Sequence, residues 1–346
     1  MERKMAHIEV INNIFSIPNA DAIECLNVLG WEVVAKKGSF KIGDKVVYLE
    51  IDSWCPHELA PFLSKGKEPR IYNGIKGERV KSIRLRGQIS QGLVLPINIL
   101  DGKIPPEKRD VGLDVADVIG IQKWEREIPA QLQGQIKCDF PTYYISKTNV
   151  ERIQNYPNLF EEFKETPAYI AVKIDGTSST FVMCDDELHV CSRNFSLKET
   201  QRNTYWKMFY KYDIKNIIED WKNKTKKQGL AIQGEVAGPG IQKNPLKLTD
   251  IQLFVFDVYD VEQHRYFSYQ ELMDFCSNYN LPNVPIDNDN FDMSNLSVED
   301  LLNYAKGNYS NGGIREGIVV RPLIPKYSPI LKGRLSIKAI NNDYLL

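Results

Sequence analysis

Three short apolar segments in the last third of the chain each contain one charged residue: Glu235, Glu316 and Lys338. Apolar runs of this length, bounded by glycine and polar residues, are typical of buried strands. A charge inside a buried strand is costly unless it meets a partner. The strands that carry these charges are therefore expected to converge, so that the charged groups share one polar pocket.

A fourth charge, Lys173, lies where another apolar run, residues 169–173, comes to an end. Asp175 and Gly176 follow, and a second run covers residues 178–182, an arrangement that predicts a hairpin. A lysine at the end of a buried strand is partly withdrawn from water, which favours the neutral, nucleophilic amine. Because the string Lys-x-Asp-Gly is short and common, a solvated lysine beside an ordinary turn is the simpler interpretation of these residues alone.

If the strands converge, the pocket would combine two lysines, three carboxylates, an arginine and an aromatic wall. Such a set suits a nucleoside triphosphate, because basic groups bind phosphates, a ring stacks on the base and carboxylates hold a divalent metal through its waters. The chain has neither a P-loop nor a kinase-type glycine-rich loop. The charged members of the pocket would be Lys173, Asp175, Arg193, Glu235, Glu316 and Lys338.

The composition sets broad limits on partners and compartment. The 346 residues predict about two domains, and a net charge of −1 means that a nucleic-acid partner would need a local basic surface. The six cysteines lack Cys-x-x-Cys spacing, which predicts reduced thiols and argues against zinc or a disulfide scaffold. Since the chain shows no signal peptide and no long apolar run, we expect a cytoplasmic or otherwise intracellular monomer without a membrane partner.

The chain divides by pattern into two domains. Residues 1–122 are expected to form a small OB-type β-barrel, because short apolar segments alternate with Gly, Asp and Lys turns. Residues 123–140 mix charges with prolines without a period and are predicted to be a linker. Residues 141–346 would form the second domain.

A basic stretch near the end of the predicted barrel has two interpretations. Alternation along one strand would place Lys81 on one face and Arg84 and Arg86 on the other. The stretch is either a solvated strand face or a positively charged groove that follows a phosphate backbone.

Local signals predict several helices. A turn and a short helix are expected at residues 17–24, and Thr148 could cap another short helix. An apolar stripe at helical spacing predicts one long helix from about 198 to 224. Capping-box sequences at Ser268 and Ser297 predict two further helix starts.

Six short motifs occur in the order typical of the covalent nucleotidyltransferases, the superfamily of DNA ligases, RNA ligases and mRNA capping enzymes. Within this superfamily the chain resembles ATP-dependent RNA ligases, in the branch with an N-terminal OB domain found in the Deinococcus and Naegleria RNA repair ligases. Residues 17–21, 85–92, 147–155 and 338–346 are similar to that branch as well. The six motifs are 173–176, 192–194, 234–235, 254–257, 316–321 and 336–338.

The resemblance implies an α+β fold, in which an OB-type barrel precedes a nucleotidyltransferase domain of ATP-grasp-like antiparallel sheets with helices. It implies that Lys173 attacks the α-phosphate of ATP, expels pyrophosphate and keeps AMP as a phosphoramidate. The AMP would pass to an RNA 5′-phosphate, and a 3′-hydroxyl would then displace it. The expected substrates are nicked duplexes in RNA repair. Covalent catalysis of this kind splits one difficult condensation into easier steps.

Roles for single residues also follow from the resemblance. Lys338 would contact the α-phosphate, and Arg193 the ribose or the RNA end. Glu235 and Glu316 would face the ribose and a hydrated Mg²⁺ or Mn²⁺, with Asp175 on the metal's waters.

The rest of the nucleotide site is implied in the same way. Phe256 would stack on adenine, with Phe254 as the alternative, and Val319 and Arg321 would lie beneath the base. RNA would be bound by Lys81, Arg84, Arg86 and Arg193. Further nucleotide contacts would come from Lys147, Thr148, Arg152, Ile174, Gln154 and Ser178.

One departure and three alternatives remain at this point. Ile340 stands where many relatives carry a second basic residue, which leaves open how phosphate charge is neutralised in the later steps.

A DNA ligase or capping enzyme usually carries its OB domain after the catalytic one. A non-catalytic nucleic-acid-binding protein would be expected to have lost one of the embedded charges, and an OB-type tRNA-binding module would explain only the first third of the chain.

Overall fold

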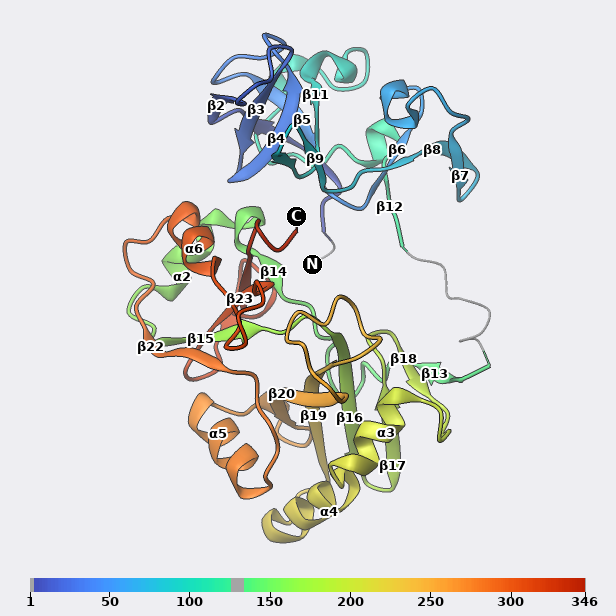
Figure 1. The fold of residues 1–346 in the computed structure, drawn as a ribbon, viewed down its shortest axis with the longest axis vertical. Coiled ribbons are helices and arrows are strands. Elements are labelled where there is room, and N and C mark those ends of the chain that lie inside the picture. Colours follow the sequence, from blue (N-terminus) through green and yellow to red (C-terminus); the bar gives the residue numbers. More distant parts are fainter. Residues whose placement is uncertain (1–2, 126–133, 346) are drawn as a thin grey trace. The chain divides into compact units, whose positions relative to one another are not determined.

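The computed structural model describes residues 3–125 and 134–345, which fall into two compact units (Figure 1). The first unit contains residues 1–127 with the last two residues, and the second contains residues 128–344. Residues 126–133 of the predicted linker lie outside the described residues. Among the described residues, no helix is both long and apolar enough to cross a membrane.

The first unit is built almost entirely from β-strands. Strands β1, β5 and β11 form one antiparallel sheet, β2, β3 and β4 form another, β12, β6, β8 and β7 form a third, and β9 pairs with β10. The strands are β1 (Ala6–Val10), β2 (Asn13–Ser16), β3 (Ile23–Val28), β4 (Trp31–Lys36), β5 (Lys45–Leu49), β6 (Ser53–Pro56), β7 (Arg70–Tyr72), β8 (Ile75–Arg79), β9 (Ile83–Leu85), β10 (Gln88–Ser90), β11 (Leu93–Pro96) and β12 (Gln122–Lys123). Short 3₁₀ helices cover Pro61–Ser64, Ile97–Leu100, Pro106–Lys108 and Asp117–Ile119.

Strand β5 lies at the centre of this unit and contributes to two cores. Val47 and Leu49 enter one apolar cluster, whereas Val46 and Tyr48 enter the other. Alternate residues of a strand point to opposite faces, so both faces of β5 are covered. This packing is that of a small closed β-structure and agrees with the expected barrel.

Two local predictions in the first unit were wrong. Residues 17–24 begin with a turn, but β3 follows at Ile23 in place of the expected helix. Leu26 and Val28 are buried two residues apart, and this period fits a strand that pairs on both sides. The segment expected to alternate from Lys81 to Arg86 is a strand only at Ile83–Leu85, and both faces of that strand are exposed.

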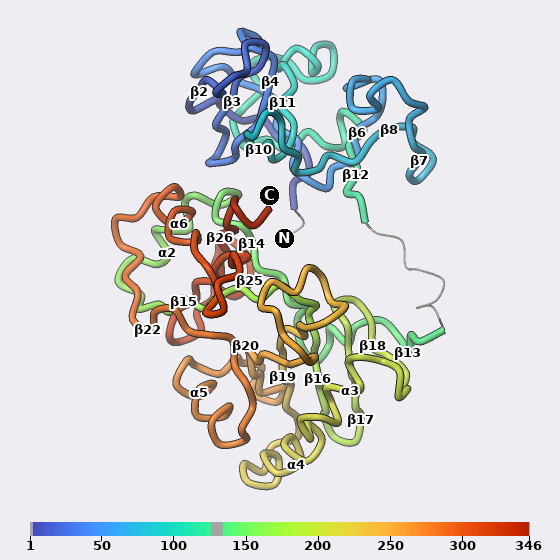
Figure 2. Tube along the Cα trace, in the orientation of Figure 1, coloured from blue at the N-terminus to red at the C-terminus, as the bar shows by residue number. Residues whose placement is uncertain are grey.

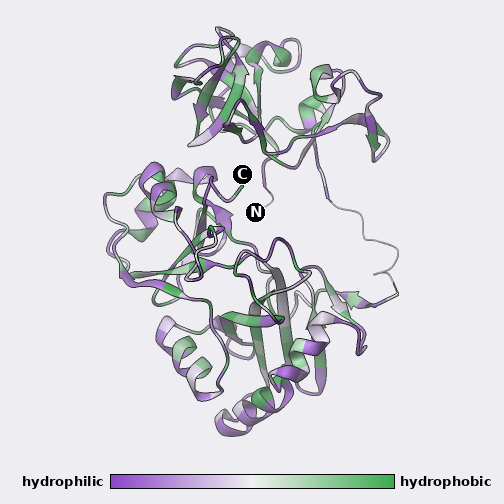
Figure 3. Ribbon diagram, in the orientation of Figure 1, coloured by the Kyte–Doolittle hydropathy of each residue, from purple (hydrophilic) through white to green (hydrophobic). Residues whose placement is uncertain are grey.

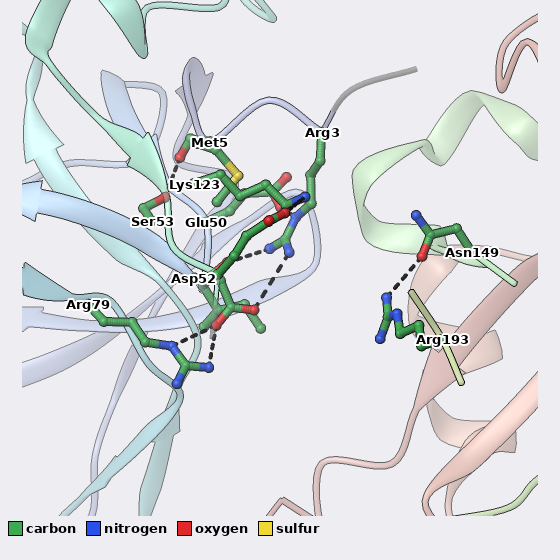
Figure 4. Close-up of polar contacts among 11 residues, drawn as sticks. Arg3, Met5, Glu50, Asp52, Ser53, Arg79, Lys123, Asn149 and Arg193 are labelled. Atoms are coloured by element: carbon green, nitrogen blue, oxygen red, sulfur yellow. Dashed lines mark hydrogen bonds and ion pairs between the residues drawn. The ribbon is translucent and has the colours of Figure 1, made fainter. Parts of the chain in front are cut away.

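Charged side chains join the start of this unit to its strands (Figure 4). Arg3 forms an ion pair with Glu50 and donates a hydrogen bond to the backbone oxygen of Ile51 at 2.6 Å. Arg79 donates through its Nε to Asp52 at 2.8 Å. These pairs fasten the N-terminal segment and the end of β8 to the turn after β5.

The second unit contains two large sheets. The larger has the strand order β13-β18-β17-β16-β19-β20-β21, and the smaller has the order β14-β26-β23-β15-β22. The strands are β13 (Ile136–Asp139), β14 (Glu151–Arg152), β15 (Ala168–Lys173), β16 (Thr177–Cys184), β17 (Glu187–Cys191), β18 (Phe195–Leu197), β19 (Gly229–Ala237), β20 (Gln252–Asp260), β21 (Arg265–Tyr266), β22 (Ile286–Phe291), β23 (Gly317–Pro322), β24 (Tyr327–Ser328), β25 (Gly333–Arg334) and β26 (Ile337–Ile340).

Helices cover the outer faces of both sheets. Residues of α3, α4 and α5 share one apolar cluster with β16, β19 and β20, where Figure 3 shows hydrophobic colour along the strands. Residues of α2 and α6 pack against β15, β23 and β26 in a second cluster. The helices are α2 (Phe160–Phe163), α3 (Thr204–Lys211), α4 (Ile214–Thr225), α5 (Tyr269–Asn278) and α6 (Val298–Ala305), with 3₁₀ turns at Ile153–Asn155 and Pro157–Leu159.

The helix predictions had mixed outcomes. Capping boxes at Ser268 and Ser297 start α5 and α6, as expected. The predicted long helix is two helices, α3 and α4, because Asp213 between them adopts a left-handed backbone with φ of 51°. Thr148 caps no helix, and the residues after it form β14, which pairs in parallel with β26 although the two lie far apart in the sequence (Figure 2).

Part of the predicted linker is a strand of the second unit. Strand β13 pairs antiparallel with β18 at the edge of the larger sheet, with a bulge between Ile136 and Cys138. Three of its four residues are exposed. Because an edge strand has few buried residues and tolerates charge, its sequence shows little apolar alternation.

Candidate active site

The site lies where the chain crosses from the smaller sheet to the larger one. Strand β15 ends at Lys173 and pairs with β22 and β23, whereas β16 begins at Thr177 and pairs with β17 and β19. The predicted hairpin was therefore wrong, because the two runs belong to different sheets. The Asp175–Gly176 turn connects the sheets and places its side chains between them.

Gly176 allows this crossing. A Cβ atom at this position would lie 2.4 Å from the backbone oxygen of Val236 and 2.8 Å from the Cγ of Glu235. No larger residue fits without moving β19. The glycine therefore brings the turn into contact with the strand that carries Glu235.

Lys173 and Glu316 form the central charge pair of the site. The Nζ of Lys173 lies 2.8 Å from Oε2 of Glu316, and the two side chains are 23% and 18% exposed. Glu316 comes directly before β23, in which Gly317 is the register partner of Lys173. The pairing of β15 with β23 thus sets the distance between the two side chains.

Lys338 reaches the same place from the next strand. It lies on β26, opposite Val319 of β23 and beside Arg152 of β14. Burial and the neighbouring cations Arg152 and Lys173 lower the pKa of Lys338 to about 7. Strand β23 lies between β15 and β26, so the two lysines come from the two strands that flank it.

Glu235 enters from the larger sheet. Its register partners are Ser178 of β16 and Phe254 of β20. Burial raises the pKa of the Glu235 carboxyl to about 7. Lys173 opposes this shift, whereas the carboxylates of Glu316 and Asp175 add to it. The structure thus brings together charges from both sheets, as the embedded charges predicted.

Residues 147–149 line the site on the side of the larger sheet. The Nζ of Lys147 donates to Oδ1 of Asn194 at 3.4 Å, and the hydroxyl groups of Thr148 and Ser178 lie 2.5 Å apart. Arg193 donates to Oδ1 of Asn149 at 2.9 Å, as Figure 4 shows. Arg193 also affects the pKa values of both Glu235 and Lys338, which places it near both groups.

The predicted aromatic wall is present on β20. Phe254 and Phe256 are both partly buried against one apolar cluster, which also contains Ile174. The guanidinium of Arg321 lies 5.6 Å from the ring centroid of Phe256 and donates to the backbone oxygen of Phe256 at 3.2 Å. Arg321 is 4% exposed and pairs with Asp257, so it supports the wall from within the protein.

Gln154 is a buried amide in the 3₁₀ turn Ile153–Asn155. It is 1% exposed, and within the described part of the chain neither of its side-chain amide atoms makes a hydrogen bond. It belongs to the 3₁₀ turn that follows Arg152, next to β26 and Lys338. Because buried amides are normally satisfied, this group points to a bound molecule.

Sequence reasoning missed three tyrosines that support the site. Tyr309 contacts the backbone on both sides of the Lys173–Glu316 pair. Burial and the neighbouring carboxylate of Asp175 raise the pKa of Tyr344. Tyr205 shares a hydrogen bond of 2.8 Å with the hydroxyl of Thr177. Such contacts join residues far apart in the chain, and no local pattern announces them.

The three other predicted nucleic-acid contacts lie in the first unit. Lys81, Arg84 and Arg86 are all exposed, the last two on the β9–β10 hairpin. Arg86 and Gly87 both have positive φ values, 51° and 86°, as a two-residue hairpin turn requires. The hairpin also exposes Ile83 and Leu85, so basic and apolar groups lie together on it.

The carboxylates of the site suit a hydrated metal better than a directly ligated one. Among the described residues, no group of three or more His, Cys, Asp or Glu side chains could hold an ion by itself. Glu235, Glu316 and Asp175 are nevertheless close enough to raise the pKa of Glu235 by mutual repulsion. A cation held through its waters would relieve that repulsion.

Comparisons with known proteins agree with this site. A family model described as RNA ligase matches residues 166–340, and a model of an OB-fold domain matches residues 5–97. A search of curated proteins finds no match. A structure of Naegleria gruberi RNA ligase with PPi is 37% identical, covers 99% of this chain and 98% of that chain, and has a TM-score of 0.80. A variant of that ligase with AMP and Mn is 38% identical over the same shares, with a TM-score of 0.81.

The OB-type barrel followed by a nucleotidyltransferase domain, expected from the sequence, is thereby confirmed. The chain belongs to the RNA ligase family.

Proposed function

We propose that this RNA ligase uses ATP to join RNA 3′-hydroxyl and 5′-phosphate ends, with AMP carried on Lys173 between the steps. The observation that carries the proposal is the ion pair of Lys173 with Glu316, at 2.8 Å, beside a strand pair that brings a second lysine, Lys338, into the same sheet. A structure of the Naegleria relative contains ATP and Mn, which supports ATP as the nucleotide.

Lys173 is proposed as the nucleophile. Its amine attacks the α-phosphorus of ATP, a P–N bond forms, and the bond to pyrophosphate breaks. The amine must lose a proton to attack, and Oε2 of Glu316, 2.8 Å away, lies within reach to accept it. Glu316 also holds the amine in one direction, which supports attack in line with the leaving group.

Lys338 is proposed to neutralise the α-phosphate. In the empty site, burial and two neighbouring cations lower its pKa to about 7. A bound phosphate supplies the missing negative charge and favours the protonated amine. Arg152, beside Lys338 on β14, would contribute to the same phosphate site. Ile340 lies two residues after Lys338 on β26, on the same face of the strand, where it is buried and brings no second charge.

Asp175, Glu235 and Glu316 are proposed to hold a hydrated Mg²⁺ or Mn²⁺. When bound, the metal supplies positive charge against the phosphate oxygens. Glu235 would also bind the ribose, because it lies between Ser178 and Phe254 in the sheet.

The remaining nucleotide contacts are proposed around the base. Phe256 stacks on adenine and is held by Arg321, with Val319 on the neighbouring sheet. Buried Gln154 offers an amide to the ligand. Lys147, Thr148, Ile174 and Ser178 complete the group.

Arg193 in the catalytic unit and the β9–β10 hairpin of the OB unit are proposed to bind RNA. Arg84 and Arg86 would bind phosphates, and the exposed Ile83 and Leu85 would contact bases or sugars. We further propose that the protein acts as a monomer on nicked duplexes in intracellular RNA repair, an environment that would keep its unpaired cysteines reduced.

Labelling with α-³²P-ATP and a divalent metal tests the nucleophile. Wild type and Lys211→Ala, a control at an exposed lysine, should become labelled, whereas Lys173→Ala should not. Labelling of Lys173→Ala to the wild-type level would refute the assignment. Sealing of a nick with a ribose or a deoxyribose 3′ end then tests RNA specificity, because equal activity on both would contradict it.

A further inference from the structure

The hydroxyl group of Tyr309 connects the two segments that carry the central charge pair. It donates a hydrogen bond to the backbone oxygen of Lys173 at 2.7 Å. It accepts one from the backbone N–H of Asp175 at 3.2 Å and one from the backbone N–H of Glu316 at 3.2 Å. Lys173 ends β15 and Asp175 lies in the turn between the sheets, whereas Glu316 directly precedes β23.

These three bonds use the full capacity of the hydroxyl, which has one proton and two lone pairs. Tyr309 is 6% exposed, and burial raises its pKa, so the hydroxyl keeps the proton that it donates. Among the described residues, no other side chain forms hydrogen bonds to the backbone both at residues 173–175 and at Glu316. The phenol is therefore the direct link between the backbones of Lys173 and Glu316 beyond the ladder of β15 and β23.

The loop that carries Tyr309 is held rigidly. The backbone N–H of Tyr309 donates to the oxygen of Gly313 at 2.6 Å. Arg315, 7% exposed, donates to the backbone oxygens of Ala305 at 3.1 Å and Lys306 at 3.1 Å. A rigid loop can fix the phenol, and through it the backbone of the turn.

We propose that Tyr309 is a positioning residue for the adenylation of Lys173. The inference rests on the proposed function. Its hydroxyl fixes the backbone at Lys173 relative to Glu316, so that the amine is aimed at the α-phosphorus when ATP is bound. The hydroxyl of Tyr309 makes its three hydrogen bonds to backbone atoms, and it does not need to contact the nucleotide.

The step that depends on this link is the attack by Lys173. Sealing of an already adenylated RNA uses the 3′-hydroxyl as nucleophile and does not require the lysine to attack. Loss of the hydroxyl should therefore slow adenylation more than the sealing of adenylated RNA. A general loss of stability would slow both steps alike, so the ratio of the two effects separates positioning from folding.

The test is Tyr309→Phe in the full chain, with Tyr279→Phe as the matched control. The hydroxyl of Tyr279, the residue after α5, also donates a hydrogen bond to a protein acceptor, Asp220 of α4, at 2.7 Å. In single-turnover labelling, we expect the adenylation rate of Tyr309→Phe at saturating ATP to fall about 10- to 100-fold. The ATP concentration at half-maximal rate should stay within about twofold, and sealing of adenylated RNA should fall less than about threefold. The control should match wild type in both steps.

Unchanged adenylation, an equal loss in both steps, or a change confined to the ATP concentration dependence would each overturn the proposal. If Tyr309→Phe does not fold, as judged by thermal unfolding, Arg315→Lys replaces it. That variant weakens the support of the loop and should show the same imbalance between the steps. Failure of wild type to become labelled at Lys173 would instead refute the proposed function itself.

Discussion

Replacing Glu235 by glutamine should stabilise the empty protein, although it removes a group proposed to bind the nucleotide. The pKa of the Glu235 carboxyl is raised from 4.5 to about 7, first by burial and then by Glu316 and Asp175. The folded protein therefore holds this proton more tightly than the unfolded chain does. Ionisation of Glu235 costs folding free energy, and the cost grows as the pH rises from about 4.5 to about 7.

The size of the effect follows from the shift. At about 1.4 kcal/mol per pKa unit, the raised pKa of Glu235 lowers the free energy of unfolding by about 3 kcal/mol at pH 8. At pH 5 the loss is only about 1 kcal/mol, because the carboxyl of the folded protein is still protonated. Glutamine is neutral at both values and pays neither cost. The advantage of Glu235→Gln over wild type should thus increase by roughly 2 kcal/mol between pH 5 and pH 8. For a domain of this size, that is about 4–8 °C in the unfolding temperature.

Thermal and urea unfolding of wild type and Glu235→Gln at pH 5, 6, 7 and 8, without nucleotide or metal, measure this difference. Glu219→Gln serves as the control, because Glu219 lies on the surface of α4 and its side chain is 45% exposed. The control should follow wild type at every pH. A stability difference between Glu235→Gln and wild type that does not change with pH, or that shrinks as the pH rises, would refute the reasoning.

Three other outcomes follow from the structure. The pH profile of adenylation at low ATP should be bell-shaped with a maximum near pH 7. Without nucleotide, Glu235 is protonated below about pH 7 and Lys338 loses its charge above about pH 7. An adenylation rate that does not change from pH 5 to pH 9 would contradict this prediction. Burial lowers the pKa of His7, but the carboxylates of Glu50, at 3.6 Å, and Glu9, at 2.7 Å, outweigh it and raise the pKa from 6.5 to about 9. The stability that these two contacts contribute is therefore complete below about 6.5 and lost as the pH rises through 9. Unfolding of wild type should therefore show this loss between pH 7 and 10, and a His7→Gln variant that shows the same loss would exclude His7 as its source. Gly176→Ala should slow adenylation by about tenfold or more, because the new Cβ would lie 2.4 Å from a backbone oxygen of β19, and an unchanged rate in labelling assays would show that the turn can move.

The convergence of charges could be predicted from the sequence because burial leaves a local signal. Glu235 and Lys338 are each the single charged residue in an apolar run, and burying such a charge is unfavourable unless it has a partner. That argument specified which groups meet, but it could not specify how the strands pair. The runs on either side of Asp175 look like a hairpin, and the structure separates them into two sheets, because each run finds its partners elsewhere in the chain.

Other parts of the site could not be predicted, because they depend on contacts between distant residues. The hydroxyl of Tyr309 donates to a backbone oxygen 136 residues away in the chain. Every residue has a backbone oxygen, so the type of the partner residue gives no sign of such a bond. The helix break at Asp213 was hidden for a different reason. The apolar stripe continues through α3 and α4, and the left-handed residue between them changes the direction of the chain without interrupting the stripe.

Two charged groups of the site, Glu235 and Lys338, are electrostatically unfavourable in the protein alone, and they come from different sheets. Glu235 is kept from ionising by burial and by two other carboxylates, and Lys338 is kept from protonation by burial and by other cations. If the protein had been arranged for stability alone, these two groups would form an ion pair with each other. They lie on different sheets instead, Glu235 on β19 and Lys338 on β26, and ATP and a divalent metal together would add the opposite charge that each favours: phosphate for the lysine, and a cation for the carboxylate. The free energy that the fold gives up to keep them separate is recovered when the nucleotide binds, which favours occupancy of the site and fixes the charged groups in the positions needed at phosphorus.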